Sequence, residues 1–454
     1  MSKLERQPLV GKYKPYPEYK DSGVEWLGKI PSHWAIKKIA WYFKAQKGRN
    51  AQMLTKEFCG ENPGDFPVYS GQTENDGVMG SINSYEFDSA QDGCLFATTV
   101  GAKAMTLSFL KGKFSLSQNC MVITPTSDVI DTRFYFYHCQ PLFSYERGLI
   151  PEHMQASFRM EDLYQYQIAM PNLQEQQTIA AFLDYETARI DWLIAQQQRL
   201  IELLKEKRQA VISHAVTKGL NPDAPMKDSG VEWIGQVPEH WQCVPFGLLV
   251  SRADLGGNYL GGQEENGIPF LKMGNLGRGC IVLDKLECLE EGSSFDDAHR
   301  LSMGDFLFNT RNSLDLVGKV AVWHDELEFA LYNSNLLRVR FKKDFISSPD
   351  FMGFVFNSSG ALGWLALLAK GTTSVAAIYY KDLRSMVVPI PPVDEQNAIS
   401  SFISKCLSRL DTLEEKAIQS INLMNERRTA LISAAVTGKI DLRGWTPPAD
   451  EVAA

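Results

Sequence analysis

The residues of this chain that could do chemistry are few and isolated. Two Gly-Lys pairs, at 318–319 and 438–439, lack the spacing and the following hydroxyl residue of a phosphate-binding loop. The run Glu-Glu-Lys at 414–416 resembles half of a nuclease motif, but it lies in a predicted helix and fits a solvated charged face. His33 and His240 each precede a tryptophan in a repeated Pro-x-His-Trp element, where we expect a structural role.

Motifs for a cofactor or a metal are also missing from the sequence. No Asn/Asp-Pro-Pro-Tyr/Phe motif of amino-methyltransferases occurs, and no Cys/His cluster has metal-ligand spacing. The sequence therefore predicts no catalytic residue, no metal site and no cofactor in this chain.

Composition narrows the class of protein. The chain has 454 residues, is 44% hydrophobic and carries a net charge of −8, which fits two to four globular domains. Its eight cysteines form no Cys-x-x-Cys pair, which favours reduced thiols and a cytoplasmic protein. Neither a signal peptide nor a run of about 18 apolar residues is present, so we expect no membrane association. Because the net charge is negative, any binding to a polyanion must depend on local patches.

The chain repeats itself. Residues 20–34 reappear at 227–241, and residues 175–217 reappear at 395–437. Repeats of this length indicate a tandem duplication, which has to be settled before any other prediction of fold. A protein with two copies of one unit is expected to engage something that has two related halves.

Two segments predict long helices. Residues 174–216 and 394–436 contain neither proline nor glycine and are rich in helix-forming residues. Each follows a proline, Pro171 or Pro391, and precedes a glycine, Gly219 or Gly438, as helix boundaries often do.

Both segments carry a heptad pattern, which predicts a coiled coil formed by the two helices, antiparallel within one chain. The residues that recur every seven positions, and that we expect to face the other helix, form the seam of each segment. They are Leu183, Ile190, Gln197, Leu204 and Val211 in the first segment, and Ile403, Leu410, Ala417, Met424 and Leu431 in the second. Gln197 and Ala417 are weak residues for such a seam: a polar residue there either sets the register of the helices or marks an exposed stretch, and we favour exposure. Further apolar residues add to the predicted face, namely Ile179, Phe182, Leu193, Leu200, Ile399, Phe402 and Leu413.

The parts before the helices hold short apolar runs between turn residues, which predict strands of a compact mixed domain. The expected fold is mixed α/β: two similar globular domains separated by two long antiparallel coiled-coil helices, with a pseudo-twofold internal repeat. The predicted division is residues 1–170 for an N-terminal segment and first domain, 171–220 for the first helix, 221–390 for a linker and second domain, 391–440 for the second helix and 441–454 for a tail.

The repeated Lys-Asp-Ser-Gly-Val-Glu-Trp element at 20–26 and 227–233, each copy leading a variable domain and followed by a Glu-Gln helix start at 175–176 or 395–396, resembles the specificity subunit of type I restriction-modification systems. The resemblance covers nearly the whole chain. It implies two target recognition domains, each binding one half of a bipartite double-stranded DNA sequence. It also implies two methyltransferase subunits docked on the helices and motor-nuclease restriction subunits in the full complex. S-adenosylmethionine, ATP and Mg would then be bound by those partners.

Contacts to DNA need hydrogen-bonding groups for base edges and cations for phosphates. The first globular domain is acidic, so we expect a local cluster, in which the candidates are Gln72, Thr98, Thr99, Lys103, Lys111, Lys113, Gln118 and Asn119. Near strand ends of the second domain, the candidates are Lys272, Asn275, Arg311, Asn312, Lys319, Asn335, Thr372 and Thr373.

Three other interpretations stay open at this point. One is a single-chain methyltransferase–nuclease, which the missing motifs disfavour. Another is a coiled-coil scaffold, and the third is a specificity subunit that serves a methyltransferase without a restriction partner. The DNA target and its spacer length cannot be deduced from the sequence.

Overall fold

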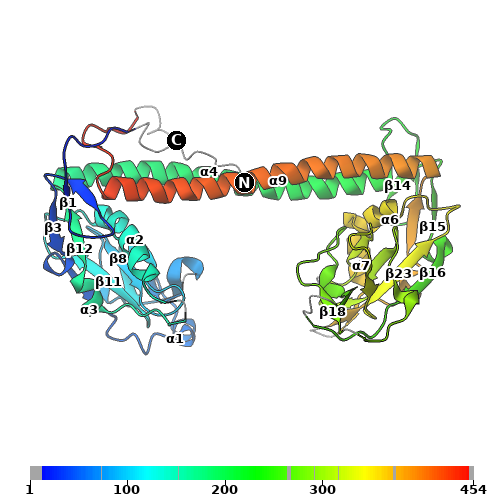
Figure 1. Cartoon of the computed structure of the whole chain (residues 1–454), viewed down its shortest axis with the longest axis horizontal. Helices are drawn as coiled ribbons and strands as arrows, with labels where there is room; N and C mark the ends of the chain where they lie inside the picture. Colours follow the sequence, from blue (N-terminus) through cyan, green and yellow to red (C-terminus); the bar gives the residue numbers. More distant parts are fainter. Residues whose placement is uncertain are drawn as a thin grey trace. The chain divides into compact units, whose positions relative to one another are not determined.

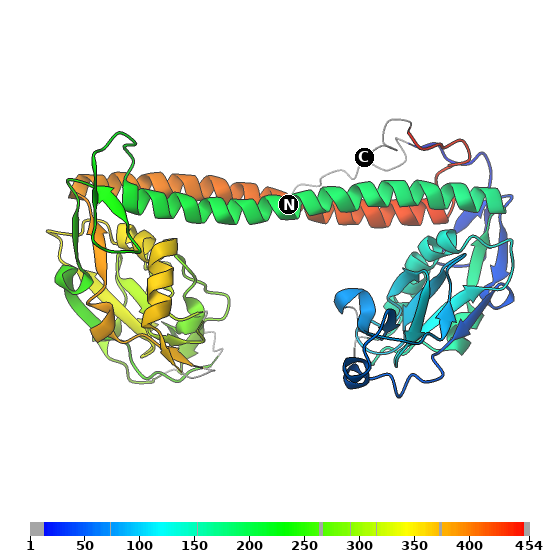
Figure 2. The ribbon, with the colours of Figure 1, turned by 180° about the vertical axis from the view of Figure 1, so that it is seen from behind.

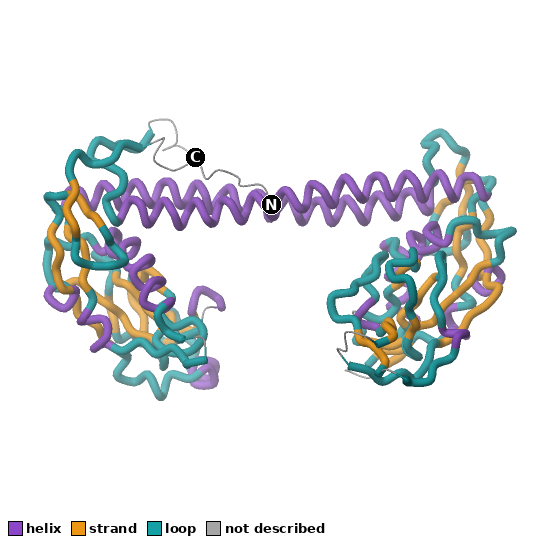
Figure 3. Tube along the Cα trace, viewed as in Figure 1, coloured by secondary structure: helices purple, strands orange, loops and turns teal. Residues whose placement is uncertain are grey.

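The computed structural model describes residues 13–72, 74–151, 153–262, 267–290, 292–314, 316–371 and 375–448. The chain divides into two compact units. Unit 1 comprises residues 1–197 and 419–454, and unit 2 comprises residues 198–418. Each unit combines strands and helices, which confirms the predicted mixed α/β class (Figures 1 and 3). The unit boundaries fall inside the two long helices, so each unit holds part of both.

The two long helices are confirmed as α4 (Leu173–Lys218) and α9 (Val393–Val436). They pack side by side in each unit (Figures 1 and 2). In unit 2, Lys205 and Arg208 of α4 form ion pairs with Glu414 and Asp411 of α9, respectively. As the residue number rises on one helix it falls on the other, so the helices are antiparallel there.

Unit 1 contains the other halves of the two helices. Its main hydrophobic core includes Leu183 and Ile190 of α4 together with Leu431 and Val436 of α9. The start of α4 therefore packs against the end of α9, which is again the antiparallel arrangement.

The heptad pattern predicted the row of residues at the helix contact better than it predicted the additional apolar residues beside this row. Leu183, Ile190, Ile403 and Leu431 are buried, as expected. Ala417 was expected to be exposed, but it is 3% exposed because its small side chain allows close helix contact. Four residues assigned to the apolar face are wrongly placed: Leu200, Leu413 and Phe402 are exposed, and Leu193 is only half-buried. A helix pair buries a narrow stripe, and these residues lie beside it.

The sheets of unit 1 stand between the helix pair and the loops. One sheet has the order β4-β11-β8-β9 and another the order β6-β5-β10-β7, in which β5 and β10 are parallel. Helix α2 (Thr132–Gly148) packs against the first sheet. The strands are β4 (Phe43–Gln46), β5 (Phe66–Tyr69), β6 (Val78–Ile82), β7 (Phe87–Asp88), β8 (Cys94–Thr98), β9 (Leu107–Leu110), β10 (Lys113–Leu116) and β11 (Cys120–Pro125).

Smaller elements surround this framework. Two short antiparallel pairs are formed by β1 with β2 and by β3 with β12. Their bounds are β1 (Tyr19–Asp21), β2 (Lys29–Pro31), β3 (Ala35–Lys38) and β12 (Gln167–Met170), and the remaining helices are α1 (Lys56–Glu61) and α3 (Met160–Gln165).

Unit 2 repeats the larger part of this framework, although its second sheet has three strands where unit 1 has four, and it contains a further three-stranded sheet. Its sheet β16-β23-β19-β21 corresponds to β4-β11-β8-β9, and the parallel pair of β17 and β22 corresponds to that of β5 and β10. The strands are β13 (Met226–Asp228), β14 (Gln236–Pro238), β15 (Gln242–Pro245), β16 (Val250–Leu255), β17 (Ile268–Leu271), β18 (Glu287–Leu289), β19 (Phe306–Asn309), β20 (Arg311–Asn312), β21 (Val320–Val322), β22 (Leu331–Tyr332), β23 (Leu336–Phe341), β24 (Lys370–Gly371), β25 (Ala376–Ala377) and β26 (Val387–Ile390).

The helices of unit 2 differ more from those of unit 1. In place of the single α2, unit 2 has α6 (Pro349–Phe356) and α7 (Ser359–Leu368), whose buried residues share a core with β19, β21 and β23. Its short helices are α5 (Phe246–Leu249) and α8 (Tyr380–Leu383).

Among the described residues, no single helix is long and apolar enough to cross a membrane, and the bent pair α6–α7 meets the criteria only by combined length and composition.

The repeated Glu-Gln pair fixes the start of each long helix. The side chain of Gln176 donates to the carbonyls of Pro171 and Val129, and its oxygen accepts from the Asp131 amide. Gln396 repeats this pattern in unit 2, with Pro391, Phe345 and Ser347 as its partners. Both glutamines are fully buried.

The neighbouring glutamates bind the repeated tryptophans. Glu175 is 3% exposed and accepts hydrogen bonds from the indole of Trp34 at 3.1 Å and from the hydroxyl of Tyr16 at 2.5 Å. Glu395 accepts from Trp241 at 3.1 Å in the same way. His33 and His240 lie 3.1 and 2.8 Å from these carboxylates, which supports their predicted structural role.

The terminal segments cover α4 in unit 1. Phe182 is fully buried beneath Tyr13 and Trp445, each at a ring-centroid distance of 5.4 Å. Its repeat in unit 2, Phe402, is 43% exposed. In unit 2 the chain continues through Leu220 into the linker, and among the described residues no segment covers Phe402 as Tyr13 and Trp445 cover Phe182.

Replacing a seam leucine by aspartate should destabilise the protein. Leu204 is 8% exposed, so Leu204→Asp places a carboxylate in an apolar contact and should lower the free energy of unfolding by about 3 kcal/mol or more. Leu200→Asp is the matched control on the same helix, because Leu200 is 39% exposed, and it should cost within about 0.5 kcal/mol. Denaturant unfolding of both variants measures the difference, and equal losses would show that the seam is misplaced.

A buried histidine predicts a pH dependence of stability. His138 of α2 donates through Nδ1 to the carbonyl of Val436 and accepts at Nε2 from the Ala169 amide. Burial lowers the pKa of His138 from 6.5 to about 4, so the folded state keeps it neutral. The neutral His138 side chain contributes fully to the free energy of unfolding above about pH 6.5. This contribution, up to about 3 kcal/mol, is lost as the pH falls towards 4. The loss of unfolding free energy over this range should be smaller in His138→Gln, and an identical pH profile would contradict the assignment.

Candidate nucleic-acid interface

Polar loops of unit 1 meet where three strands begin or end. The Gly71 amide donates to the carbonyl of Gln118 at 3.2 Å, and the Thr99 amide donates to that of Asn119 at 2.8 Å. The side chains of Gln72, Gln118 and Asn119 are exposed there. We call the segments 70–72, 98–106 and 117–119 the reading loops of unit 1. Their exposed amides offer the donors and acceptors that base edges require.

Two predicted contact residues instead support these loops from inside. Thr98 and Thr99 are 1% and 2% exposed. The hydroxyl of Thr98 donates to the carbonyl of Lys103 and accepts from the Thr106 amide at 3.1 Å. Thr98 and Thr99 were predicted as DNA contacts, but in this structure both side chains are buried and the Thr98 hydroxyl lies inside a turn.

The three predicted lysines do not form one cluster. Lys103 is exposed within the reading loops. Lys111 and Lys113 lie at the opposite ends of β9 and β10, and five residues of extended chain, about 16 Å, separate Lys113 from Gln118. Lys113 instead lies 4.5 Å from the ring centre of Tyr85, and a hydrogen bond with this tyrosine raises the pKa of Lys113. Their predicted position beside Gln118 is corrected accordingly.

Two cations that were not among the predicted contact residues, Lys47 and Arg49, lie on a segment that runs towards the reading loops. Gln46 of β4 pairs with Val122 of β11 in antiparallel register, so the chain after β4 runs towards Asn119. Lys47 and Arg49 follow in this segment and are exposed. A signal was present in the sequence, because residues 26–56 hold seven lysines and arginines and no acidic residue, within a chain of net charge −8.

Two neighbouring cavities of unit 2 collect most of the candidates there. Lys272, Asn275, Asn312 and Lys319 line one cavity of about 490 Å³. A second cavity of about 320 Å³ is lined by Arg311 and Asn335, with Asn258 and Tyr379. Arg311 and Asn312 are consecutive residues of β20, and each lines a different one of the two cavities.

Two candidates in unit 2 are committed to local contacts. Asn275 is 4% exposed, and its amide accepts from the Lys272 backbone and donates to the Val282 carbonyl, both at 2.9 Å. Its predicted role as an outward contact is wrong. Lys272 forms an ion pair with Glu287, so less of its charge is left for a phosphate. Thr372 and Thr373 lie outside the described residues.

The arrangement of unit 2 follows that of unit 1. Thr310 follows β19 as Thr99 follows β8, and Asn335 precedes β23 as Asn119 precedes β11. The Thr310 amide donates to the Asn335 carbonyl at 3.0 Å, just as Thr99 bonds Asn119. Equivalent loops on one framework thus carry different side chains.

Comparison with known proteins identifies this framework. The model of the type I restriction modification DNA specificity domain matches residues 31–203 and 262–423. The chain belongs to this family. The specificity subunit of type I restriction enzyme EcoKI from Escherichia coli K12 is 28% identical over 280 residues, which are 60% of this chain and 57% of that protein. The MjaVIII specificity subunit of Methanocaldococcus jannaschii is 24% identical over 432 residues, covering 91% of this chain and 95% of the relative.

A solved structure supports the fold of this specificity family. Its title describes complex assembly and conformational transition of the type I R-M system. The TM-score is 0.65, with 90% of this chain and 98% of that chain covered. At 15% sequence identity this similarity shows the fold alone.

Lys47 and Arg49 should contribute to DNA affinity without choosing the sequence. Lys47→Ala and Arg49→Ala should each weaken DNA binding by the assembled complex evenly across sequences and lower the salt slope by about one unit. Lys29→Ala is the matched control, because Lys29 is exposed on β2 beside the tryptophan motif and away from the reading loops. Salt titrations of binding measure the slopes, and three equal slopes would exclude the segment after β4 from the interface.

Proposed function

We propose that this chain selects the DNA sequence for a type I restriction-modification complex, with each unit binding one half of a bipartite double-stranded target. The supporting observation is that the two units share the order of a four-stranded sheet and a parallel strand pair, while the loops at matching strand ends differ. Gln118 and Asn119 project in unit 1, whereas Arg311 and Asn335 line a cavity in unit 2. A rigid framework with exchanged loops changes what is recognised without changing the fold.

The chemistry of the loops fits sequence selection more closely than tight binding. Amide side chains form paired hydrogen bonds with adenine, and arginine forms them with guanine. The chain as a whole is acidic, so its own phosphate contacts are few and local. The assembled complex would therefore obtain much of its DNA affinity from other subunits.

The helices are the proposed docking elements. We propose that α4 and α9 form the coiled coil that holds the two recognition domains apart and that two methyltransferase subunits dock on them, one for each repeat. Restriction subunits would join through the methyltransferases. The partners would supply S-adenosylmethionine, ATP and Mg, so that the chain itself is not catalytic and works in the cytoplasm.

The proposal is tested by reconstitution and by domain exchange. The pure chain should transfer no methyl groups, and adding methyltransferase subunits should yield methylation of one bipartite sequence. Exchanging residues 30–170 for those of a family member with another target should change one half of that sequence and leave the other half intact. Methylome sequencing provides the measurement.

Three outcomes would contradict the proposal. Methyl transfer by the pure chain would make it an enzyme. Changes in both halves after the exchange would refute one half-site per unit. Failure of the complex to select any sequence would leave only a scaffold role.

A further inference from the structure

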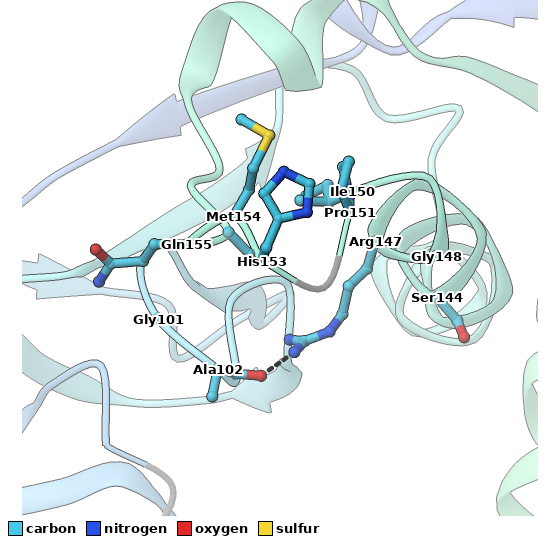
Figure 4. Close-up of a pocket in the computed structure, with 11 residues that line it drawn as sticks. Gly101, Ala102, Ser144, Arg147, Gly148, Ile150, Pro151, His153, Met154 and Gln155 are labelled. Atoms are coloured by element: carbon cyan, nitrogen blue, oxygen red, sulfur yellow. Dashed lines mark hydrogen bonds between the residues drawn. The ribbon is translucent and has the colours of Figure 1, made fainter.

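Two adjoining cavities of unit 1 lie beside the reading loops. The first, of about 710 Å³, is lined by residues of the loop at 101–102, the end of α2 and residues 150–151 and 153–156 (Figure 4). The second, of about 480 Å³, lies between the loop 102–107, α2 and α9. Ala102, Ser144 and Arg147 line both cavities. We call the two cavities together the basic trough.

Among the described residues that line the trough, the charged ones are the cations Lys103, Arg147 and Arg428, and none is a carboxylate. Arg147 lines both cavities, whereas Lys103 and Arg428 line the second. Arg428 comes from α9, whereas the other two come from the recognition domain of the same unit. Cations that converge on one hollow favour an anionic ligand there.

Arg147 is fixed where the two cavities meet. Its guanidinium donates to the carbonyls of Ala102 and, at 2.7 Å, Ala104 (Figure 4). These bonds use two of its five N–H groups, so the others can meet a ligand while the loop stays in place. Arg428 is held similarly, because its Nε donates to the carboxylate of Asp191 at 3.2 Å.

The trough continues from the reading loops. The turn that places Lys103 is closed by the hydroxyl of Thr98, and the next residue, Thr99, bonds the carbonyl of Asn119. Lys103 also lines the cavity that Arg147 and Arg428 share, so a ligand that enters this cavity from the reading loops meets three cations. DNA presents one phosphate charge per roughly 3.4 Å of each strand, so a duplex offers negative charge along this entire path.

We propose that the basic trough binds the phosphate backbone of DNA next to the first half-site, with Arg428 of the long helix as one of its ligands. The proposal rests on the DNA-binding function proposed above. The shared chemistry is a phosphate group, and the source to which we commit is the duplex as it leaves the recognised bases. Helix α9 then contacts DNA directly, in addition to positioning the recognition domains.

Unit 2 has a cavity between its own recognition domain and α9 with the opposite chemistry. It measures about 430 Å³ and is lined by Asp350, Asp411 and Glu415, together with His324. Carboxylates repel a phosphate, so the proposed backbone contact belongs to unit 1 alone. The two halves of the target should consequently differ in the salt dependence of their binding.

The experiment compares neighbouring arginines in the full chain assembled with methyltransferase subunits. Arg428→Gln removes a trough cation, and Arg427→Gln is the matched control because Arg427 is exposed and lines neither cavity. Salt titration of binding to the methylated target should show a slope lowered by about one unit for Arg428→Gln and unchanged for Arg427→Gln. The methylated sequence should stay the same for both.

A further variant separates the cation from its ion pair. Asp191→Asn removes the partner of Arg428 but keeps the arginine, so its slope should match that of the wild type. Equal slopes for Arg428→Gln and Arg427→Gln would overturn the proposal, as would a lowered slope for Asp191→Asn. Protection of the trough by inorganic phosphate or ATP, without any effect of Arg428→Gln on the slope, would assign the trough to a small phosphate ligand instead. If the wild-type complex selects its target normally, such results refute the trough and leave the proposed function standing.

Discussion

The fold depends on a carboxylate at the start of each long helix, which is buried in unit 1 and half-buried in unit 2. Glu175 accepts the indole N–H of Trp34 and the hydroxyl of Tyr16, so a single carboxylate joins the helix, the repeated tryptophan motif and the N-terminal segment. Gly438, just after α9, lies beside Trp34 and so close to the ring of Pro31 that no side chain would fit. The end of α9 is therefore attached at the same point. In unit 2, Glu395, Trp241 and Gly219 form the equivalent junction.

These junctions explain why an imperfect heptad pattern is sufficient to align α4 and α9. A coiled coil that sets its own register needs strong apolar residues along its whole seam. Here each unit anchors the start of one helix against the end of the other, which fixes the antiparallel alignment at the ends. Half-buried Gln197 and small Ala417 are tolerated between them, because register does not depend on those positions.

Sequence alone predicted the elements that have strong local signals. Unbroken helix-forming composition located α4 and α9 to within a few residues, and the exact repeats indicated two matching frameworks. The site was harder. Thr98 and Asn275 are polar residues beside strand ends, as an interface requires, yet their side chains close local turns. Whether a polar group faces outward depends on backbone partners far away in the sequence, which no spacing pattern records.

The positions of the cations near the candidate interface were equally hard to predict from the sequence. Lys111 and Lys113 are close to Gln118 along the chain but lie at the other end of the strand, whereas Lys47 is distant in sequence and follows a strand that runs towards Asn119. Arg428 is more distant still, because it reaches the recognition domain of unit 1 only after the chain has passed through all of unit 2. Antiparallel pairing creates such neighbours, and the sequence indicates the pairing without its register.

The unequal covering of Phe182 and Phe402 makes the two repeats present different helix surfaces. In unit 1, Tyr13 and Trp445 pack on Phe182, and the Asp441 amide bonds the carbonyl of Lys14. In unit 2 the equivalent ring of Phe402 is 43% exposed. A molecule that approached the same helix position in both repeats would therefore meet an aromatic ring in unit 2 and a layer of covering chain in unit 1.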